Sequence, residues 1–176
     1  MLFRSENSPC VGEMAKLNFS MDLKLVKEEN KMEEGTFNPS LHTAHTPFYF
    51  IVRNDNKDSQ DYGQKIWFGF PSYDYRHTTL STEERIHWDL GTSTYIYSTA
   101  AQEFWGDINF KDKNWHHGEV DIKPMIIDAL NDMHSKDIFL NTSLTDLKVT
   151  YMNFGWEIPG TFDAAVRVKN ISLKAV

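Results

Sequence analysis

The chain has 176 residues, 40% of them hydrophobic, and a formal net charge of -7 at pH 7. This length fits one globular domain with its own core, and no apolar run approaches the roughly 20 residues needed to cross a bilayer. The sequence pI is near 5.4, and Lys and Arg are scattered among acidic residues, so neither nucleic acid nor a membrane is expected as a partner.

The first five residues are interpreted, from their sequence alone, as lying outside the natural coding sequence. Met1-Leu-Phe-Arg-Ser5 matches one reading frame of a common sequencing adapter, which suggests a metagenomic gene fragment. We interpret residues 1–10 as a disordered or artefactual segment and residues 11–176 as a single domain. On this interpretation, the lack of a signal peptide carries no weight. The one cysteine, Cys10, has no partner for an internal disulfide.

Three strands are predicted in the first part of the domain. Residues 17–25 alternate strictly between apolar and polar side chains, which is typical of a strand with one buried face. Residues 47–53 are apolar on both faces, as in a central strand. Residues 65–70 form a return strand after a polar turn rich in Asn, Asp and Ser, so these last two strands are expected to make a hairpin.

The middle of the chain predicts three more strands and one helix. The strands are expected at residues 92–98, 103–110 and 115–122, whereas residues 71–90 carry no clear pattern. A helix is predicted at about 124–135, because Pro124 suits a first helical turn and the following apolar residues fall at helical spacing. We expect this helix to pack over an end or edge of the sheet.

The C-terminal third predicts two strands, at residues 147–154 and 164–175, joined by a turn-rich loop. In the last strand the apolar pattern changes phase at Asn170, which indicates a β-bulge. The total of about eight strands and one helix, without alternating strand and helix, predicts an all-β fold. We expect a jelly-roll β-sandwich of two antiparallel sheets.

Two carboxylates in one predicted strand suggest an enzyme as one alternative. Glu119 and Asp121 resemble part of the Glu-x-Asp-x-x-Glu signature of laminarinase-type glycoside hydrolases, in which two carboxylates flank the scissile bond. The third carboxylate of that signature is absent, since Lys123-Pro124 follows. No Gly-x-Ser-x-Gly motif, phosphate-binding glycine motif or Cys/His cluster with metal-ligand spacing accompanies them.

Aromatic rings beside polar groups suggest a binding site instead. A sugar presents an apolar C–H face and a rim of hydroxyls, which flat aromatic rings and carboxylate or guanidinium groups complement. The alternative interpretation is that the tryptophans are buried and the charges form surface ion pairs. The candidate ligand-binding residues lie in three clusters: Tyr73, Asp74 and Arg76; Trp88 and Asp89; Trp156 and Glu157.

From about Val11 to Val176 the chain resembles the galactose-binding-like jelly-roll modules of bacterial polysaccharide-degrading proteins. The resemblance is carried by the alternating strand at 17–25, the segment Trp115-x-x-x-x-Val-Asp121 and the final Val168-Lys-Asn-Ile-Ser-Leu173. It implies non-catalytic polysaccharide binding, an extracellular or cell-surface location in a larger multidomain protein, and in many members a structural calcium ion with no other cofactor. The predicted helix is unusual for such a module.

The sequence therefore favours a carbohydrate-binding module that recognises a polysaccharide or oligosaccharide by aromatic stacking and polar contacts. The first alternative is a glycoside hydrolase or polysaccharide lyase that uses Glu119 and Asp121. The second is a structural or interaction module without a sugar site. Fold resemblance alone does not decide among them.

Overall fold

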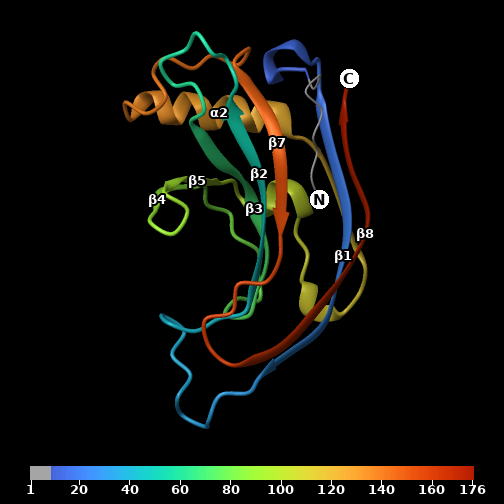
Figure 1. The fold of residues 1–176 in the computed structure, drawn as a ribbon. Coiled ribbons are helices and arrows are strands. Elements are labelled where there is room, and N and C mark those ends of the chain that lie inside the picture. Colours follow the sequence, from blue (N-terminus) through green and yellow to red (C-terminus); the bar gives the residue numbers. More distant parts are fainter. Residues whose placement is uncertain (1–8) are drawn as a thin grey trace.

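The computed structural model describes residues 9–176, which form two β-sheets packed face to face with one long helix beside them (Figure 1). The predicted all-β sandwich is confirmed. Of the segment predicted to be disordered or artefactual, residues 1–8 lie outside the described part of the chain. The smaller sheet has the order β6 (His116–Asp121), β1 (Leu17–Asn30), β8 (Phe162–Ala175). The larger sheet has the order β4 (Arg85–Asp89), β5 (Thr94–Ser98), β3 (Lys65–Asp74), β2 (His45–Asn54), β7 (Leu147–Phe154).

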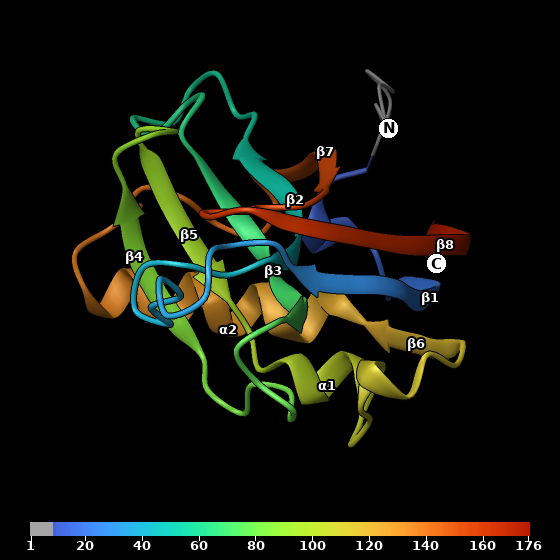
Figure 2. The same cartoon turned by 90° about the horizontal axis from the view of Figure 1, so that it is seen from below.

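The strand pairing is antiparallel except at one place. Strands β1 and β8, β2 and β7, and β4 and β5 form antiparallel pairs. Strand β5 instead runs parallel to β3, which differs from the expectation of purely antiparallel sheets. The chain leaves β3, forms β4 at the sheet edge, and returns as β5 between them. Figure 2 shows β4 and β5 at the edge farthest from β8.

The core between the sheets is built mainly from phenylalanine rings. Phe48 and Phe70 stack with ring centroids 5.4 Å apart, and Phe70 stacks on Phe104 at 4.3 Å. Phe19 of β1 lies 4.7 Å from Phe48 and so joins the two sheets. These four rings are all buried, at 4% exposure or less. Because side chains alternate along a strand, inward phenylalanines in β2 and β3 leave their neighbours facing outward.

The predicted helix is confirmed as α2 (Ile122–Ser135), which starts two residues before the predicted range. Asp121 caps its first turn by accepting a hydrogen bond from the backbone N–H of Lys123. Its buried stripe is Ile122, Ile126, Ala129, Leu130 and Met133. The helix packs near Tyr97 and Ile86, on the inner face of β5 and β4. The helix and the three-stranded sheet therefore both pack on the inner face of the larger sheet and together enclose the core.

Three segments differ from the sequence prediction. The prediction of a strand at residues 103–110 is wrong. The chain instead forms α1 (Ala101–Trp105), which ends at Gly106, a residue with a positive φ of 71°. The 3-10 turn η2 (Phe110–Asp112) follows. Strand β4 lies in the segment that carried no clear pattern. Strand β1 continues past residue 25 to Asn30, because a bulge between Leu25 and Lys27 restores its pairing with β8. A second 3-10 turn, η1 (Val11–Glu13), precedes β1.

The β-bulge predicted at Asn170 is confirmed. Ser20 pairs with Ser172 and Asp22 with Lys169, so two residues of β8 face the single residue Met21. Asn170 has a positive φ of 53°, a conformation that asparagine tolerates better than most residues. The bulge fixes which residues of β8 share a face with β1.

We expect Gly118→Ala to lower the free energy of unfolding by about 1–3 kcal/mol, because overpacking displaces a buried ring. A Cβ at Gly118 would lie 2.3 Å from Cε1 of Phe104, which stacks on the core phenylalanines. Urea denaturation measures the effect. Gly155→Ala is the matched control, since a Cβ there meets open space. Equal stability of both variants would contradict this account of the core.

Candidate functional site

A groove of about 420 Å³ lies on the outer face of the larger sheet, on the side away from the smaller sheet. It crosses β2, β3, β5 and β4 near the end where β2 begins. No helix or second sheet of residues 9–176 packs on this face. The outward side chains of the four strands therefore line an open surface, flanked by the segments that follow β3 and β7.

The floor of the groove is aromatic. Tyr49 of β2 and Trp67 of β3 are both half-buried, with ring centroids 5.7 Å apart and an interplanar angle of 55°. Burial raises the pKa of the Tyr49 phenol, against a smaller opposing effect of the Ser98 hydroxyl. Gly69 of β3 pairs with Tyr49 of β2, and a Cβ at Gly69 would lie only 1.8 Å from the Phe48 carbonyl oxygen. Only glycine lets β2 and β3 approach this closely.

Three buried polar groups lining the groove have no hydrogen-bond partner. They are the Trp67 indole Nε1, the Ser72 hydroxyl and the Thr99 hydroxyl. Ser72 is fully buried and Thr99 is 1% exposed. Such groups are rare in folded proteins and call for a specific explanation. These three groups lie beneath the surface of the groove and remain unsatisfied among residues 9–176.

One wall of the groove is held by His45 and Glu157. The backbone N–H of each donates to the carbonyl of the other, at 3.0 and 2.9 Å. Their side chains also pair, with His45 Nε2 2.9 Å from Glu157 Oε2. The hydrogen bond from His45 lowers the pKa of Glu157. These bonds fix the segment between β7 and β8 beside the groove.

A second wall is held by Asp74 and Arg76. The Asp74 carboxylate accepts hydrogen bonds from Arg76 Nε at 2.9 Å and from the Thr43 hydroxyl at 2.7 Å. Burial alone would raise the pKa of Asp74, but these hydrogen bonds outweigh it and lower the pKa to about 2. The Arg76 guanidinium is thus oriented by a carboxylate that stays ionised. It also donates from Nη2 to Asp74 at 2.5 Å and from Nη1 to the Pro39 carbonyl at 3.4 Å, which leaves one N–H on each of these nitrogens for further acceptors.

Strand β4 completes the groove with Arg85, His87 and Asp89. Asp89 accepts hydrogen bonds from the backbone N–H of Thr92 at 2.6 Å and from its hydroxyl at 2.7 Å. These bonds lower the pKa of Asp89. The lining thus mixes both signs of charge around an aromatic floor, which suits an uncharged ligand with many hydroxyls.

The structure brings five of the seven candidate binding residues to this groove: Tyr73, Asp74, Arg76, Asp89 and Glu157. Tyr73 is only 3% exposed, and its hydroxyl donates to Glu28, so its ring offers no face for stacking. Trp156 does not line the groove and packs edge-on against Tyr73, with centroids 6.0 Å apart. Trp88 is 50% exposed but also lies outside the lining, edge-on to Tyr95.

Sequence reasoning missed Tyr49 and Trp67. Both lie in strands that are apolar on both faces, a pattern that was interpreted as full burial. The available signal was that each aromatic ring stands between two phenylalanines or β-branched residues, which alone suffice for the core. A tyrosine and a tryptophan at matching outward positions then indicate an exposed aromatic floor.

The alternative catalytic pair lies on β6, away from the groove. One Asp121 oxygen accepts hydrogen bonds from the backbone N–H of Lys123 at 3.1 Å and of Leu17 at 2.9 Å. Asp121 therefore caps α2 and ties it to β1. The exposed Glu119 carboxylate lies 3.5 Å from His117 Nε2. This arrangement assigns Asp121 a structural role.

Comparison with known proteins finds no matching protein-family model and no matching curated protein. Among residues 9–176, no three or more His, Cys, Asp or Glu side chains lie close enough together to hold a metal ion. No helix of the described chain has the length and apolar character of a membrane span.

We expect Asp74→Asn to lower the free energy of unfolding by about 2 kcal/mol at pH 7, since each pKa unit is worth about 1.4 kcal/mol. The folded-state pKa of Asp74 lies at about 2, below the ordinary value of 3.8 for an aspartate. The contribution is therefore fully present above about pH 4 and is lost as the pH falls toward 2. Urea denaturation at several pH values measures it.

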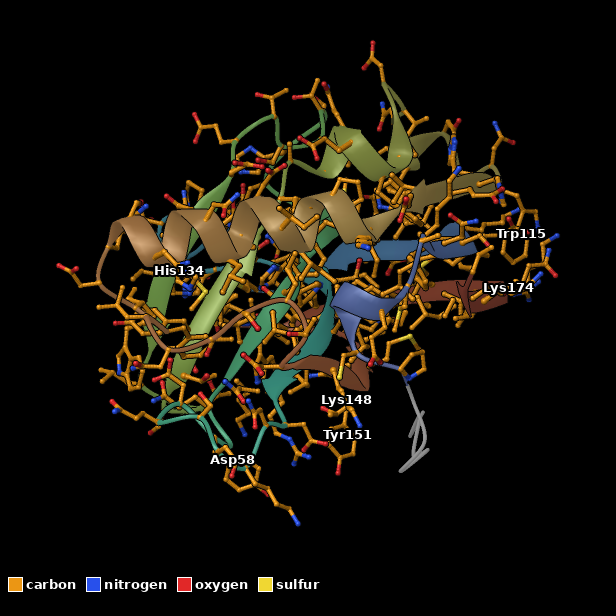
Figure 3. The ribbon with its side chains drawn as sticks, turned by 90° about the horizontal axis from the view of Figure 1, so that it is seen from above. Asp58, Trp115, His134, Lys148, Tyr151 and Lys174 are labelled. Carbon is orange, nitrogen blue, oxygen red and sulfur yellow. The ribbon has the colours of Figure 1, made fainter. Side chains whose placement is uncertain are left out.

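Asp58→Asn is the control for this prediction. Asp58 projects at the periphery of the molecule (Figure 3), and its side chain accepts none of the hydrogen bonds found among residues 9–176. A loss of stability for Asp74→Asn that did not shrink at acid pH would contradict the assigned role of the carboxylate.

Proposed function

We propose that the groove on the outer face of the larger sheet binds carbohydrate, and that the protein is a non-catalytic carbohydrate-binding module. The observation that carries this proposal is the Tyr49–Trp67 floor, an aromatic pair that lies at the bottom of an open groove instead of in the core. The apolar C–H face of a sugar ring stacks on such a floor.

The polar lining supports the same ligand class. Carboxylates of Asp89 and Glu157 accept hydrogen bonds from sugar hydroxyls, and the guanidinium of Arg76 donates to them. Because the charges on the walls are largely paired with each other, the groove favours a neutral sugar over an anionic one.

The size of the groove fits weak binding of a short stretch of polysaccharide. Its 420 Å³ lies in the lower part of the roughly 300–1,000 Å³ range of ligand pockets. Binding should be micromolar to millimolar, or about -4 to -8 kcal/mol. The protein would serve as one part of a larger, extracellular or cell-surface protein and hold it against a polysaccharide.

We expect Tyr49→Ala and Trp67→Ala each to weaken polysaccharide binding by about tenfold or more, because each removes part of the stacking floor. Affinity electrophoresis through gels containing a panel of soluble neutral polysaccharides measures the loss. Trp88→Ala is the matched control, since Trp88 is exposed but lies outside the groove lining. Circular dichroism establishes that each variant is folded.

Reducing ends assayed in the same incubations separate binding from catalysis. Retardation of the wild type without new reducing ends supports the proposal. If folded Tyr49→Ala and Trp67→Ala variants bind as the wild type does, the groove is not the site. New reducing ends that disappear in Glu119→Gln would instead support the glycoside hydrolase or lyase alternative.

A further inference from the structure

The outer face of the smaller sheet gathers basic side chains that are far apart in sequence. Strand β1 contributes Lys24, and β8 contributes Arg167, Lys169 and Lys174; these four residues are called the basic face. They lie on the outward side because the alternating residues of β1, from Leu17 to Leu25, are buried in the core. The whole chain has a net charge of -7, so this concentration of cations is local.

Two of these cations stand directly opposite each other. Lys24 pairs with Arg167 in the register of β1 and β8, and like charges in such positions destabilise a sheet. Among residues 9–176, neither side chain takes part in an ion pair. Basic residues on edge strands commonly protect against aggregation, which could explain β8. Protection of an edge strand does not explain Lys24, because β1 is the central strand of this sheet.

An exposed tryptophan lies beside the cations. Leu23 pairs with His116, so Trp115 stands one position further, next to Lys24. Trp115 is 40% exposed, and the Lys169 Nζ lies 4.2 Å from the centroid of its ring. Figure 3 shows Trp115 and Lys174 projecting from the outer side of the smaller sheet. An aromatic ring with adjacent cations can stack on a sugar and also bind a charged substituent.

The nearest carboxylate, Asp22, already has hydrogen-bond partners. Asp22 lies 2.6 Å from His117 Nδ1 through one oxygen, and its other oxygen accepts a hydrogen bond from Asn170 at 2.6 Å. The hydrogen bond to Asp22 raises the pKa of His117. The contact of Asp22 with Lys169 is longer, at 3.9 Å. Two further carboxylates lie on β6: Glu119, 3.5 Å from the opposite nitrogen of His117, and Asp121, which caps α2. The row of Lys24 and Arg167 contains no carboxylate.

We propose that the basic face binds an anionic polysaccharide, through sulfate or carboxylate groups carried along a sugar chain. This second site lies on the opposite side of the sandwich from the groove and does not depend on sugar binding there. Arg167 and Lys24 together form a two-cation site for one anionic group, and Trp115 stacks on an adjacent ring. The protein would then link a neutral and an anionic polysaccharide.

The spacing of the cations favours a sparsely charged polymer. From the Lys24–Arg167 row to the Asn18–Lys174 row, β1 advances six residues, or about 20 Å. Four cations over that length give about one charge per 5 Å. Duplex DNA carries about one charge per 1.7 Å and would meet too few cations, while the acidic remainder of the protein would repel it. Ser20 and Ser172 lie between these rows and suit sugar hydroxyls, and Glu119 of β6 completes their row.

Fluorescence anisotropy with labelled dextran sulfate tests the proposal, with the sulfate groups spaced sparsely enough to match the cations and with neutral dextran of the same length as the matched probe. We expect dextran sulfate to bind at least about tenfold more tightly than dextran, and to weaken as salt rises from about 50 to about 200 mM. The double variant Arg167→Gln/Lys169→Gln should lose about tenfold in affinity. The control Lys57→Gln/Lys65→Gln makes the same change in net charge at two other exposed lysines and should stay within about twofold.

Other polyanions identify the anionic group and the class of polymer that the basic face binds. Polygalacturonate in place of dextran sulfate tells carboxylate from sulfate recognition, and binding of either supports the proposal. Tighter binding of single-stranded DNA or polyglutamate than of both polysaccharides would overturn it in favour of nucleic acid or acidic protein. Equal losses in the two double variants would also overturn it, because they would show a response to net charge alone.

Single substitutions separate a binding role from a structural one. Lys24→Gln should weaken dextran sulfate binding without lowering the melting temperature, since it removes a repulsion. Trp115→Ala should weaken dextran sulfate binding, whereas Trp88→Ala, at another exposed tryptophan, should not. Full retention of binding by both Lys24→Gln and Trp115→Ala would place the site elsewhere.

Discussion

The packing of phenylalanine rings between the two sheets is the constraint on which the rest of the structure depends. Phe48 and Phe50 of β2, with Phe68 and Phe70 of β3, are fully buried. Because strand side chains alternate, this choice forces Tyr49 and Trp67 onto the opposite face. The same packing that stabilises the sandwich therefore also creates the aromatic floor of the groove. A one-residue shift in strand register would turn Tyr49 and Trp67 toward the core and the phenylalanines toward solvent.

The two outer faces of the sandwich differ in how their charged side chains are arranged. On the larger sheet, charged residues occur as fixed pairs, His45 with Glu157 and Asp74 with Arg76, around an aromatic centre. On the smaller sheet, Lys24 and Arg167 are opposed without a carboxylate between them. The first arrangement suits hydroxyl groups, and the second suits anions. A module with both faces could connect two kinds of polymer.

Much of the fold was predictable from local patterns. The strict alternation at residues 17–25 and the helical stripe after Pro124 each specify one element, and the phase change at Asn170 correctly located a bulge. The failures have physical causes. Helix α1 is too short to show helical periodicity, and its aromatic residues imitate a strand. Strand β4 is a largely exposed edge strand, so burial leaves little pattern in its sequence.

The functional surfaces were harder to predict because they depend on register and not on local sequence. Asp74, Arg76, Asp89 and Glu157 line the groove, and the sequence drew attention to them because each lies beside an aromatic residue. The floor residues were hidden by strands that are apolar on both faces. The opposition of Lys24 and Arg167 follows only from the pairing of the first and last strands. Pairing between distant segments cannot be read from composition or spacing.

The most direct test of the central claim is NMR of the tryptophan indole N–H groups during titration with a polysaccharide that retards the protein in gels. The chain has five tryptophans, and Trp67 alone among them lines the groove. The account predicts that the Trp67 indole signal shifts on binding while that of the buried Trp105 stays in place. Shifts confined to Trp88 or Trp156, with Trp67 unchanged, would contradict it.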